Sequence, residues 1–115
     1  MSVRNRTRGT FLATTLLNFN AHFRETLHFL NRSGIPDDCG VWITPCHAVY
    51  TVGIHQPVDI AFLDREGRIV KVLRNFPPNC YTDEVPYAIG VLELPSNCLA
   101  ESGTRAGDVL ELDPS

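Results

Sequence analysis

A cysteine, two histidines and an aspartate lie in one short and mostly apolar stretch: Cys46, His47, His55 and Asp59. A thiol beside an imidazole is the pairing that cysteine nucleophiles use, and all four side chains can bind zinc. Their spacing matches no recognised zinc pattern, and adjacent residues on a strand point to opposite faces. No catalytic residue or cofactor is therefore assigned, and Cys46, His47 and His55 are only weak metal candidates.

Asp59 is the most unusual of these residues, because both faces of its expected strand, residues 58–63, are apolar. A buried carboxylate has to be paired or hydrogen-bonded. In a structural interpretation, Asp59 accepts hydrogen bonds from the backbone or Thr51 and fixes the preceding turn. In a functional interpretation, it orients a ligand at a pocket. The second interpretation predicts a binding groove lined by His47, Tyr50, Thr51 and Asp59.

Composition and charge limit the classes of function. The chain has 115 residues, enough for one domain, and a net charge of −3. A nucleic-acid binder normally carries a basic surface, so no nucleic-acid partner is expected. Arg4, Arg6 and Arg8 are interpreted as part of a disordered basic tail over residues 1–9.

The lengths of the apolar stretches and the number of cysteines indicate in which cellular compartment the protein is expected. No stretch is long enough to span a bilayer, so no integral membrane segment is expected and a soluble, cytoplasmic protein is favoured. Free thiols are favoured because no clear export signal is visible, although export would permit one or two disulfides. The cysteines are Cys39, Cys46, Cys80 and Cys98.

Apolar runs alternate with turn residues from Val41 onward, which is typical of strands joined by short loops. The strongest hairpin signal is the turn Asp64-Arg65-Glu66-Gly67. A loop is expected over residues 79–86, and a short helical turn near residues 96–102, capped by Ser96 and ended by Gly103. The expected strands are residues 41–43, 47–54, 58–63, 68–73, 87–94 and 109–112.

Two elements are expected before this β region. Thr10–Leu17 has the content of an edge strand, and Asn18 or Asn20 can cap a helix that ends near Ser33. Together the elements predict a mainly β (α+β) fold in one domain over residues 10–115. Its architecture is a compact antiparallel β-sandwich or a partly closed barrel with one N-terminal helix, because helices are too few for parallel crossovers.

Glu93 stands between Leu92 and Leu94 in the expected strand over residues 87–94. Side chains alternate between the two faces of a strand, and one face of an antiparallel sheet is commonly solvated. This pattern predicts that Glu93 faces solvent.

An ordered set of segments identifies a family. Residues 40–54 read Gly-Val-Trp-Ile-Thr-Pro-Cys-His-Ala-Val-Tyr-Thr-Val-Gly-Ile, and residues 57–67 read Pro-Val-Asp-Ile-Ala-Phe-Leu-Asp-Arg-Glu-Gly. Val-Leu-Glu-Leu-Pro at residues 91–95 and a final Gly-Asp-Val follow. Over about residues 20–112 the chain resembles the bacterial and archaeal domain of unknown function 192. The resemblance implies a small, mainly β domain and carries over no activity.

Three classes of function remain open. The favoured one is a non-enzymatic module that binds a small molecule or peptide in the groove of His47, Tyr50, Thr51 and Asp59. A thiol- or metal-assisted hydrolase is the first alternative. The second is an interaction or assembly protein, in which the edge strand Thr10–Leu17 pairs with a protein partner or a second copy of the chain.

Overall fold

Strands form over most of the described chain, because β-branched and other apolar residues recur between turn residues. The computed structural model describes residues 2–19, 35–51 and 55–113. The prediction of a mainly β fold is confirmed within these ranges. The strands are β1 (Ser2–Asn5), β2 (Thr10–Ala13), β3 (Thr15–Phe19), β4 (Cys39–Ile43), β5 (Val58–Leu63), β6 (Ile69–Phe76), β7 (Gly90–Pro95) and β8 (Leu110–Asp113), and the helix is α2 (Cys98–Glu101).

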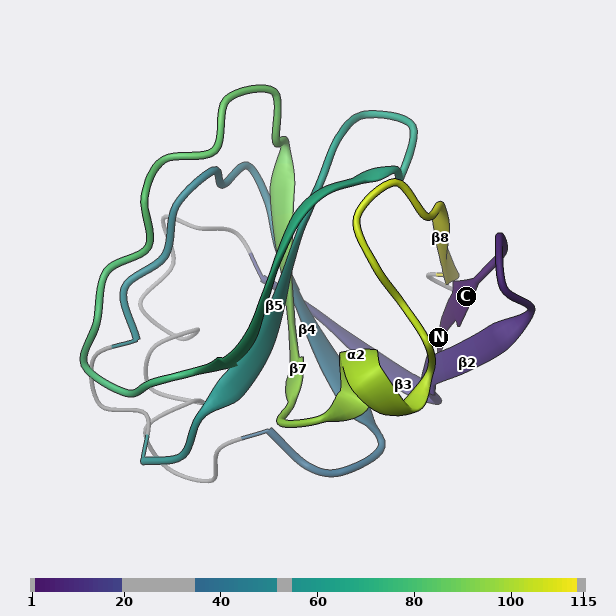
Figure 1. Cartoon of the computed structure of the whole chain (residues 1–115), viewed down its shortest axis with the longest axis horizontal. Helices are drawn as coiled ribbons and strands as arrows, with labels where there is room; N and C mark the ends of the chain where they lie inside the picture. The colour runs from purple at the N-terminus through teal and green to yellow at the C-terminus, as the bar shows by residue number, and fades with distance from the viewer. Residues whose placement is uncertain (1, 20–34, 52–54, 114–115) are drawn as a thin grey trace.

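The strands form two sheets. The smaller sheet has the order β2-β1-β8 and the larger has the order β3-β4-β7-β5-β6. Figure 1 shows the larger sheet in the middle of the molecule and the smaller sheet beside it. Within the described residues the strands do not close into a barrel, so the two-sheet architecture is the one observed.

One strand pair is parallel, which the expected antiparallel fold does not include. β3 and β4 run in the same direction, with Leu17 opposite Val41, while the other strand pairs are antiparallel. A parallel pair needs a long connection, and the chain between Phe19 and Cys39 is long enough to supply one. The predicted helix falls on that connection and lies outside the described residues, except that Asn18, one of its two candidate caps, lies in β3.

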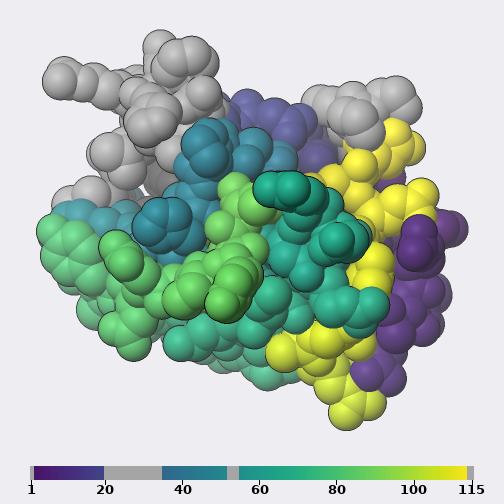
Figure 2. Space-filling view, turned by 90° about the horizontal axis from the view of Figure 1, so that it is seen from above, coloured from purple at the N-terminus to yellow at the C-terminus, as the bar shows by residue number. Residues whose placement is uncertain are grey.

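The larger sheet is buried on both faces. Its inner face packs against the smaller sheet and α2 in one apolar cluster, so the two sheets belong to one domain. Its outer face forms a second cluster under the loops of residues 44–51 and 77–89 (Figure 1). In the space-filling view, the green loop segment and the purple and yellow strands lie on opposite flanks (Figure 2).

The start of the chain belongs to the fold, so the prediction of a disordered tail is wrong for Ser2–Asn5. β1 is the middle strand of the smaller sheet, and Val3 and Asn5 are completely buried. Side chains of β1 alternate between the inside and the outside of the fold, and the outward ones include Arg4, which forms an exposed ion pair with Glu111. The arginines made the segment resemble a solvated tail in the sequence. Asn5 points inward and donates a hydrogen bond to Asp108, at 3.0 Å.

The expected strand Thr10–Leu17 is instead two strands in two sheets. The chain leaves β2 at Ala13 and enters β3 at Thr15, so β2 is an edge of the smaller sheet and β3 an edge of the larger. The backbone N–H groups of Thr14 and Thr15 both donate to the carbonyl of Asp38, which holds this crossing in place.

Residues 47–51 do not form the predicted strand. Thr51 and Cys80 are joined by a backbone hydrogen bond, and Tyr50 and Tyr81 form an isolated bridge, so this segment pairs with the second loop over the outer face. The rest of the predicted strand, residues 52–54, lies outside the described residues. Alternation alone could not separate a loop packed on a sheet from a strand within it.

The predicted hairpin and the short helix are present. Gly67 has φ +82° in the turn between β5 and β6, and its N–H donates to the carbonyl of Asp64 at 3.1 Å. Asn97 rather than Ser96 occupies the N-cap position of the helix, without a side-chain capping hydrogen bond, and Gly103 follows the helix with φ +69°. No helix among the described residues is long and apolar enough to cross a membrane.

Candidate functional site

Asp59 is completely buried in β5, on the inner face of the larger sheet. Its Oδ1 accepts a hydrogen bond from the backbone N–H of Asn75 at 2.9 Å, and its Oδ2 accepts one from Leu99 at 2.8 Å. Asn75 has φ +52° and lies where β6 shifts register against β5. The carboxylate therefore ties the irregular end of β6 and the first turn of α2 to β5, and its partners are backbone groups rather than Thr51.

Thr51 is also buried, but on the other side of the larger sheet. Its hydroxyl donates to the carbonyl of Pro77 at 2.7 Å and accepts from the N–H of Cys80 at 3.0 Å. These bonds hold together the two loops over the outer face. Thr51 and Asp59 therefore do not face one groove.

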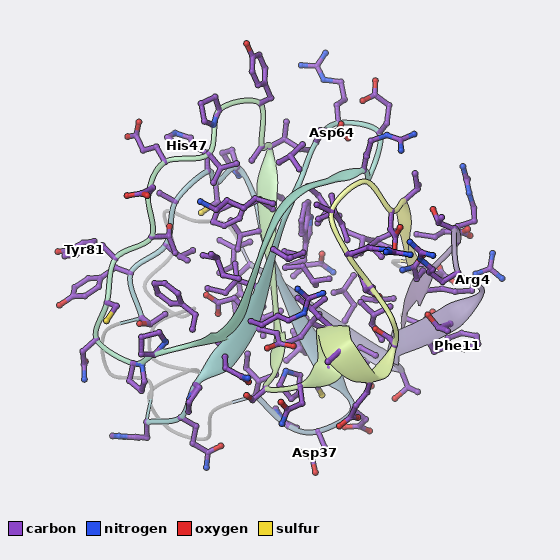
Figure 3. The ribbon with its side chains drawn as sticks, viewed as in Figure 1. Arg4, Phe11, Asp37, His47, Asp64 and Tyr81 are labelled. Atoms are coloured by element: carbon purple, nitrogen blue, oxygen red, sulfur yellow. The ribbon has the colours of Figure 1, made fainter. Side chains whose placement is uncertain are left out.

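Tyr50 and His47 lie at the surface of the same loop layer as Thr51. The rings of Tyr50 and Tyr81 stack with their centroids 3.9 Å apart and their planes inclined by 13°. Figure 3 shows His47 and Tyr81 on the side of the molecule away from Phe11. The structure thus brings three of the four predicted groove residues into one segment and leaves Asp59 elsewhere.

Cys46 is half-buried, and its thiol donates to the carbonyl of Ala48 at 3.0 Å. Burial raises the pKa of Cys46, the Ala48 hydrogen bond lowers it, and the charge of Glu93 adds to the increase, so the net pKa is raised. A raised pKa leaves less of the reactive thiolate. His47 and His55 are exposed, and no three metal-ligating side chains converge within the described residues.

Two adjoining cavities form a cleft at the end of β7, which we name the Ser96 cleft. Their volumes are about 700 and 160 Å³, and both are lined by Asp37, Pro95 and Ser96. Figure 3 shows Phe11 and Asp37 on the side of the molecule that carries α2. The larger cavity is also lined by Thr10, Phe11, Leu12, Cys98, Glu101 and Ser102, and the smaller by Ile35, Gln56, Pro57 and Val58.

Hydrogen bonds fix the walls of the Ser96 cleft. Asp59 anchors both the first turn of α2 and Asn75, and the Ser96 hydroxyl donates to the side-chain oxygen of Asn75. The Cys98 thiol donates to the carbonyl of Leu12 at 3.2 Å, which joins α2 to β2. The cleft is therefore largely preformed, and Asp59 is a positioning residue for its walls.

The Ser96 cleft has an acidic lining. Asp37 and Glu101 are exposed carboxylates on its rim, and within the part of the chain that the structure describes no basic residue lines the two cavities. Burial, followed by the charges of Asp59 and Glu101, raises the pKa of Cys98 to about 11. Cys98 therefore stays a neutral thiol there at physiological pH, and the negative potential favours cations.

Glu93 lies in β7, the central strand of the larger sheet, and is 2% exposed. Its cross-strand neighbours are the apolar residues Val41 and Ile60, and burial raises its pKa to about 7. Its Oε2 has no hydrogen-bond partner among the described residues. The prediction that Glu93 faces solvent is wrong, because the loops cover the outer face of this sheet.

Sequence reasoning missed Glu93 and the Ser96 cleft for different reasons. Glu93 carried a usable signal, since β7 is otherwise a continuous apolar run and such runs are typical of strands buried on both faces. The cleft carried none, because Asp37, Ser96 and Phe11 meet only through the pairing of distant strands.

The fold and site define a class of small two-sheet β domains with an acidic cleft at one end and a carboxyl buried in the central strand. The chain belongs to the DUF192 family, "Uncharacterized ACR", whose model matches residues 5–112. The resemblance seen over residues 20–112 is thus confirmed and extends into β1. The family is uncharacterised, so the function is unknown.

Two solved structures share the fold. A "putative transcription regulator" from Sinorhizobium meliloti 1021 is 20% identical, with a TM-score of 0.73 over 84% of this chain and 79% of that one. A protein of unknown function from Novosphingobium aromaticivorans DSM 12444 is 18% identical, with a TM-score of 0.73 over 96% and 82%. A comparison with curated proteins finds no match. At these identities the likeness extends to the fold alone.

Proposed function

We propose that this protein is a non-enzymatic binding module that holds a small molecule or a short peptide segment in the Ser96 cleft. The observation that carries this proposal is the pair of adjoining cavities, of about 700 and 160 Å³, at the end of β7. Sites for small molecules usually have volumes of roughly 300–1,000 Å³ and are largely formed before binding.

The lining supports a binding role. Phe11 and Ile35 supply apolar surface, while Asp37 and Ser96 supply polar groups that can orient a ligand. Asp59 contributes through the walls and does not need to touch the ligand. The predicted groove of His47, Tyr50, Thr51 and Asp59 is not part of this proposal, because Thr51 and Asp59 lie on opposite sides of the larger sheet.

The hydrolase alternative has weaker support. Its nucleophile would be Cys46, whose pKa is raised chiefly by burial and also by the charge of Glu93, whereas a reactive cysteine needs a lowered pKa. Its candidate base, His47, is exposed on the loop layer. These features favour a structural thiol at Cys46.

A strand-edge interaction is the second candidate, and one observation favours it. β2 is an edge of the smaller sheet, and Phe11 on it is 66% exposed. The register of β2 against β1 shifts at Leu12, and such bulges protect edges from pairing with another chain. A small ligand in the cleft is therefore the better-supported occupant.

The proposed setting of the protein is cytoplasmic, with no nucleic-acid partner. All four cysteines are free thiols, which is typical of a reducing compartment. The net charge of −3 is unfavourable for binding nucleic acid.

The proposal is tested by screening a small-molecule fragment mixture against ¹⁵N-labelled protein by NMR. We expect the chemical shift changes to cluster at the amides of Phe11, Asp37 and Cys98. Ser96→Trp fills the cleft and should abolish these changes, while Ala106→Trp, at an exposed position outside both cavities, should preserve them. Changes that persist in folded Ser96→Trp protein would rule the cleft out as the binding site.

A further inference from the structure

Glu93 is a polar group without a structural explanation. Its side chain lies among apolar neighbours, with Val41 on one side and Ile60 on the other. Its Oε2 has no hydrogen-bond partner among the described residues. Buried polar atoms are almost always satisfied, because an unpaired one costs free energy. A carboxyl oxygen left in this state has an unused capacity to accept a hydrogen bond.

The smaller cavity of the Ser96 cleft lies on the same face of the sheet as Glu93. Val58 and Pro95 pair across β5 and β7, and both line this cavity. Glu93 stands two residues before Pro95 on β7, so their side chains point to the same face about 7 Å apart. The carboxyl is therefore one step along the strand from the cavity.

The charges around the Ser96 cleft favour a cation. Asp37 and Glu101 lie on the cleft rim, and no Lys, Arg or His is among the described residues that line the two cavities. The smaller cavity also has an apolar part of its lining, to which Ile35 and Val58 contribute. A ligand with a positive end and an apolar body matches both parts.

We propose that Glu93 is the buried acceptor for an organic ammonium ion whose apolar body lies in the smaller cavity of the Ser96 cleft. The proposal rests on the binding function assigned to this cleft and names the class of its ligand. The ammonium group would donate hydrogen bonds to the Glu93 carboxylate, and a charged pair of this kind is stronger than a neutral one.

Proton release provides a signature of this pairing. Burial raises the pKa of empty Glu93 to about 7, so about half of the molecules carry a proton there at pH 7. An ammonium ion beside the carboxyl would favour its ionised form. Lys71 of β6 also lies on this face, opposite Phe62 of β5. Cys46 lies in the loops over the face, and its thiol stays protonated because burial, reinforced by the charge of Glu93, raises its pKa.

The test compares hexylammonium chloride with hexan-1-ol, which differ only in the terminal group. Both are titrated at pH 7 into protein with ¹³C-labelled Glu carboxyls. We expect hexylammonium to bind at least about tenfold more tightly than the alcohol. The Glu93 carboxyl resonance should move toward its ionised position, and calorimetry in two buffers should show release of roughly half a proton.

Two variants complete the test. Glu93→Gln should remove the preference for hexylammonium, while Glu84→Gln, an exposed glutamate, should retain it. If Glu93→Gln does not fold, the wild-type Glu93 resonance alone decides the question.

Two outcomes would overturn the inference: equal affinities of the two compounds for the wild-type protein, or a Glu93 resonance that does not move at saturation. Fragment binding that Ser96→Trp abolishes would still support the proposed function in either case.

Discussion

Two buried carboxyls on neighbouring strands differ in what surrounds them. Asp59 accepts hydrogen bonds from two backbone N–H groups, so its burial is compensated and it stabilises the walls of the cleft. Glu93 has apolar cross-strand neighbours and an unpartnered oxygen. The sequence predicted a buried or ligand-orienting carboxylate for Asp59 and a solvent-facing one for Glu93, and only the contacts separate a structural carboxylate from one without a partner among the described residues.

Replacing Glu93 should change stability in a pH-dependent way. Burial raises the pKa of Glu93 from the ordinary glutamate value of 4.5 to about 7, so wild-type stability falls as pH rises between these values and is constant above them. Glu93→Gln has no carboxyl proton to lose. At pH 8 it should be more stable than wild type by on the order of 3 kcal/mol, while at pH 4 the two should be similar. Urea denaturation at both pH values measures this difference.

Glu84→Gln is the matched control for this prediction, because Glu84 is exposed. It should leave the pH dependence of wild type unchanged. A Glu93→Gln variant that is less stable than wild type by the same amount at both pH values would show that the carboxyl has a structural partner.

At the residue scale, the sequence identified Asp59 as unusual but not its partners. The two donors, Asn75 and Leu99, lie 16 and 40 residues away along the chain, so no local pattern contained them. Cys46 and His47 stand together in the sequence, yet one is half-buried and the other exposed. Residue type predicted a candidate site, whereas tertiary pairing decided which side chains meet.

At the element scale, the hairpin turn between β5 and β6 is joined to β8. The N–H of Leu110 donates to the carbonyl of Gly67 at 2.8 Å, and Ile69 exchanges hydrogen bonds with the segment before β8. A Cβ atom at Gly67 would lie 2.6 Å from the carbonyl oxygen of Leu110. The turn therefore requires glycine both for its positive φ and for the close approach of a second backbone.

Gly67→Ala should accordingly destabilise the protein by about 3 kcal/mol, because the close contact adds to the cost of a positive φ. Gly103→Ala is the control, since Gly103 also has a positive φ, +69°, but no atom within 4 Å of the added Cβ. It should cost about 1 kcal/mol. Thermal denaturation of both variants checks the difference, and equal losses would exclude the contact with Leu110 as the cause.

Elements were predictable where the local pattern and the tertiary environment agree. Val58–Leu63 was predicted with the bounds that β5 has, because turn residues flank a short apolar run. β1 was missed because Arg4 and the neighbouring arginines suggested a solvated tail. Residues 47–51 read as a strand because they are packed on a sheet without belonging to it.

For the whole molecule, the smaller sheet depends on the start of the chain. β1 lies between β2 and β8, and its buried Asn5 joins a network with Thr104, Asp108 and Arg8. Without β1, β2 and β8 lose their only strand partner within the described residues. The apolar cluster that joins the two sheets would then be open to water.

Deleting residues 1–6 should therefore destabilise the protein by on the order of 5 kcal/mol, enough to unfold many domains of this size. Arg4→Ala, which removes only the exposed ion pair with Glu111, should change stability by less than about 1 kcal/mol. Circular dichroism during heating compares the two variants. An unchanged melting temperature after the deletion would restore the interpretation of this segment as a tail.

The pairing of β1 with β8 also has a consequence for synthesis on the ribosome. Arg4 and Glu111 face each other across these strands and are 107 residues apart in the chain. At the usual 5–20 residues per second, β1 waits roughly 5–20 s for this partner. During that interval the nascent chain exposes Val3, which is buried in the folded protein, and the backbone groups of β1 that later pair with β8. The smaller sheet is thus completed only after translation of its last strand, and until then β1 is available to a chaperone or to a neighbouring nascent chain.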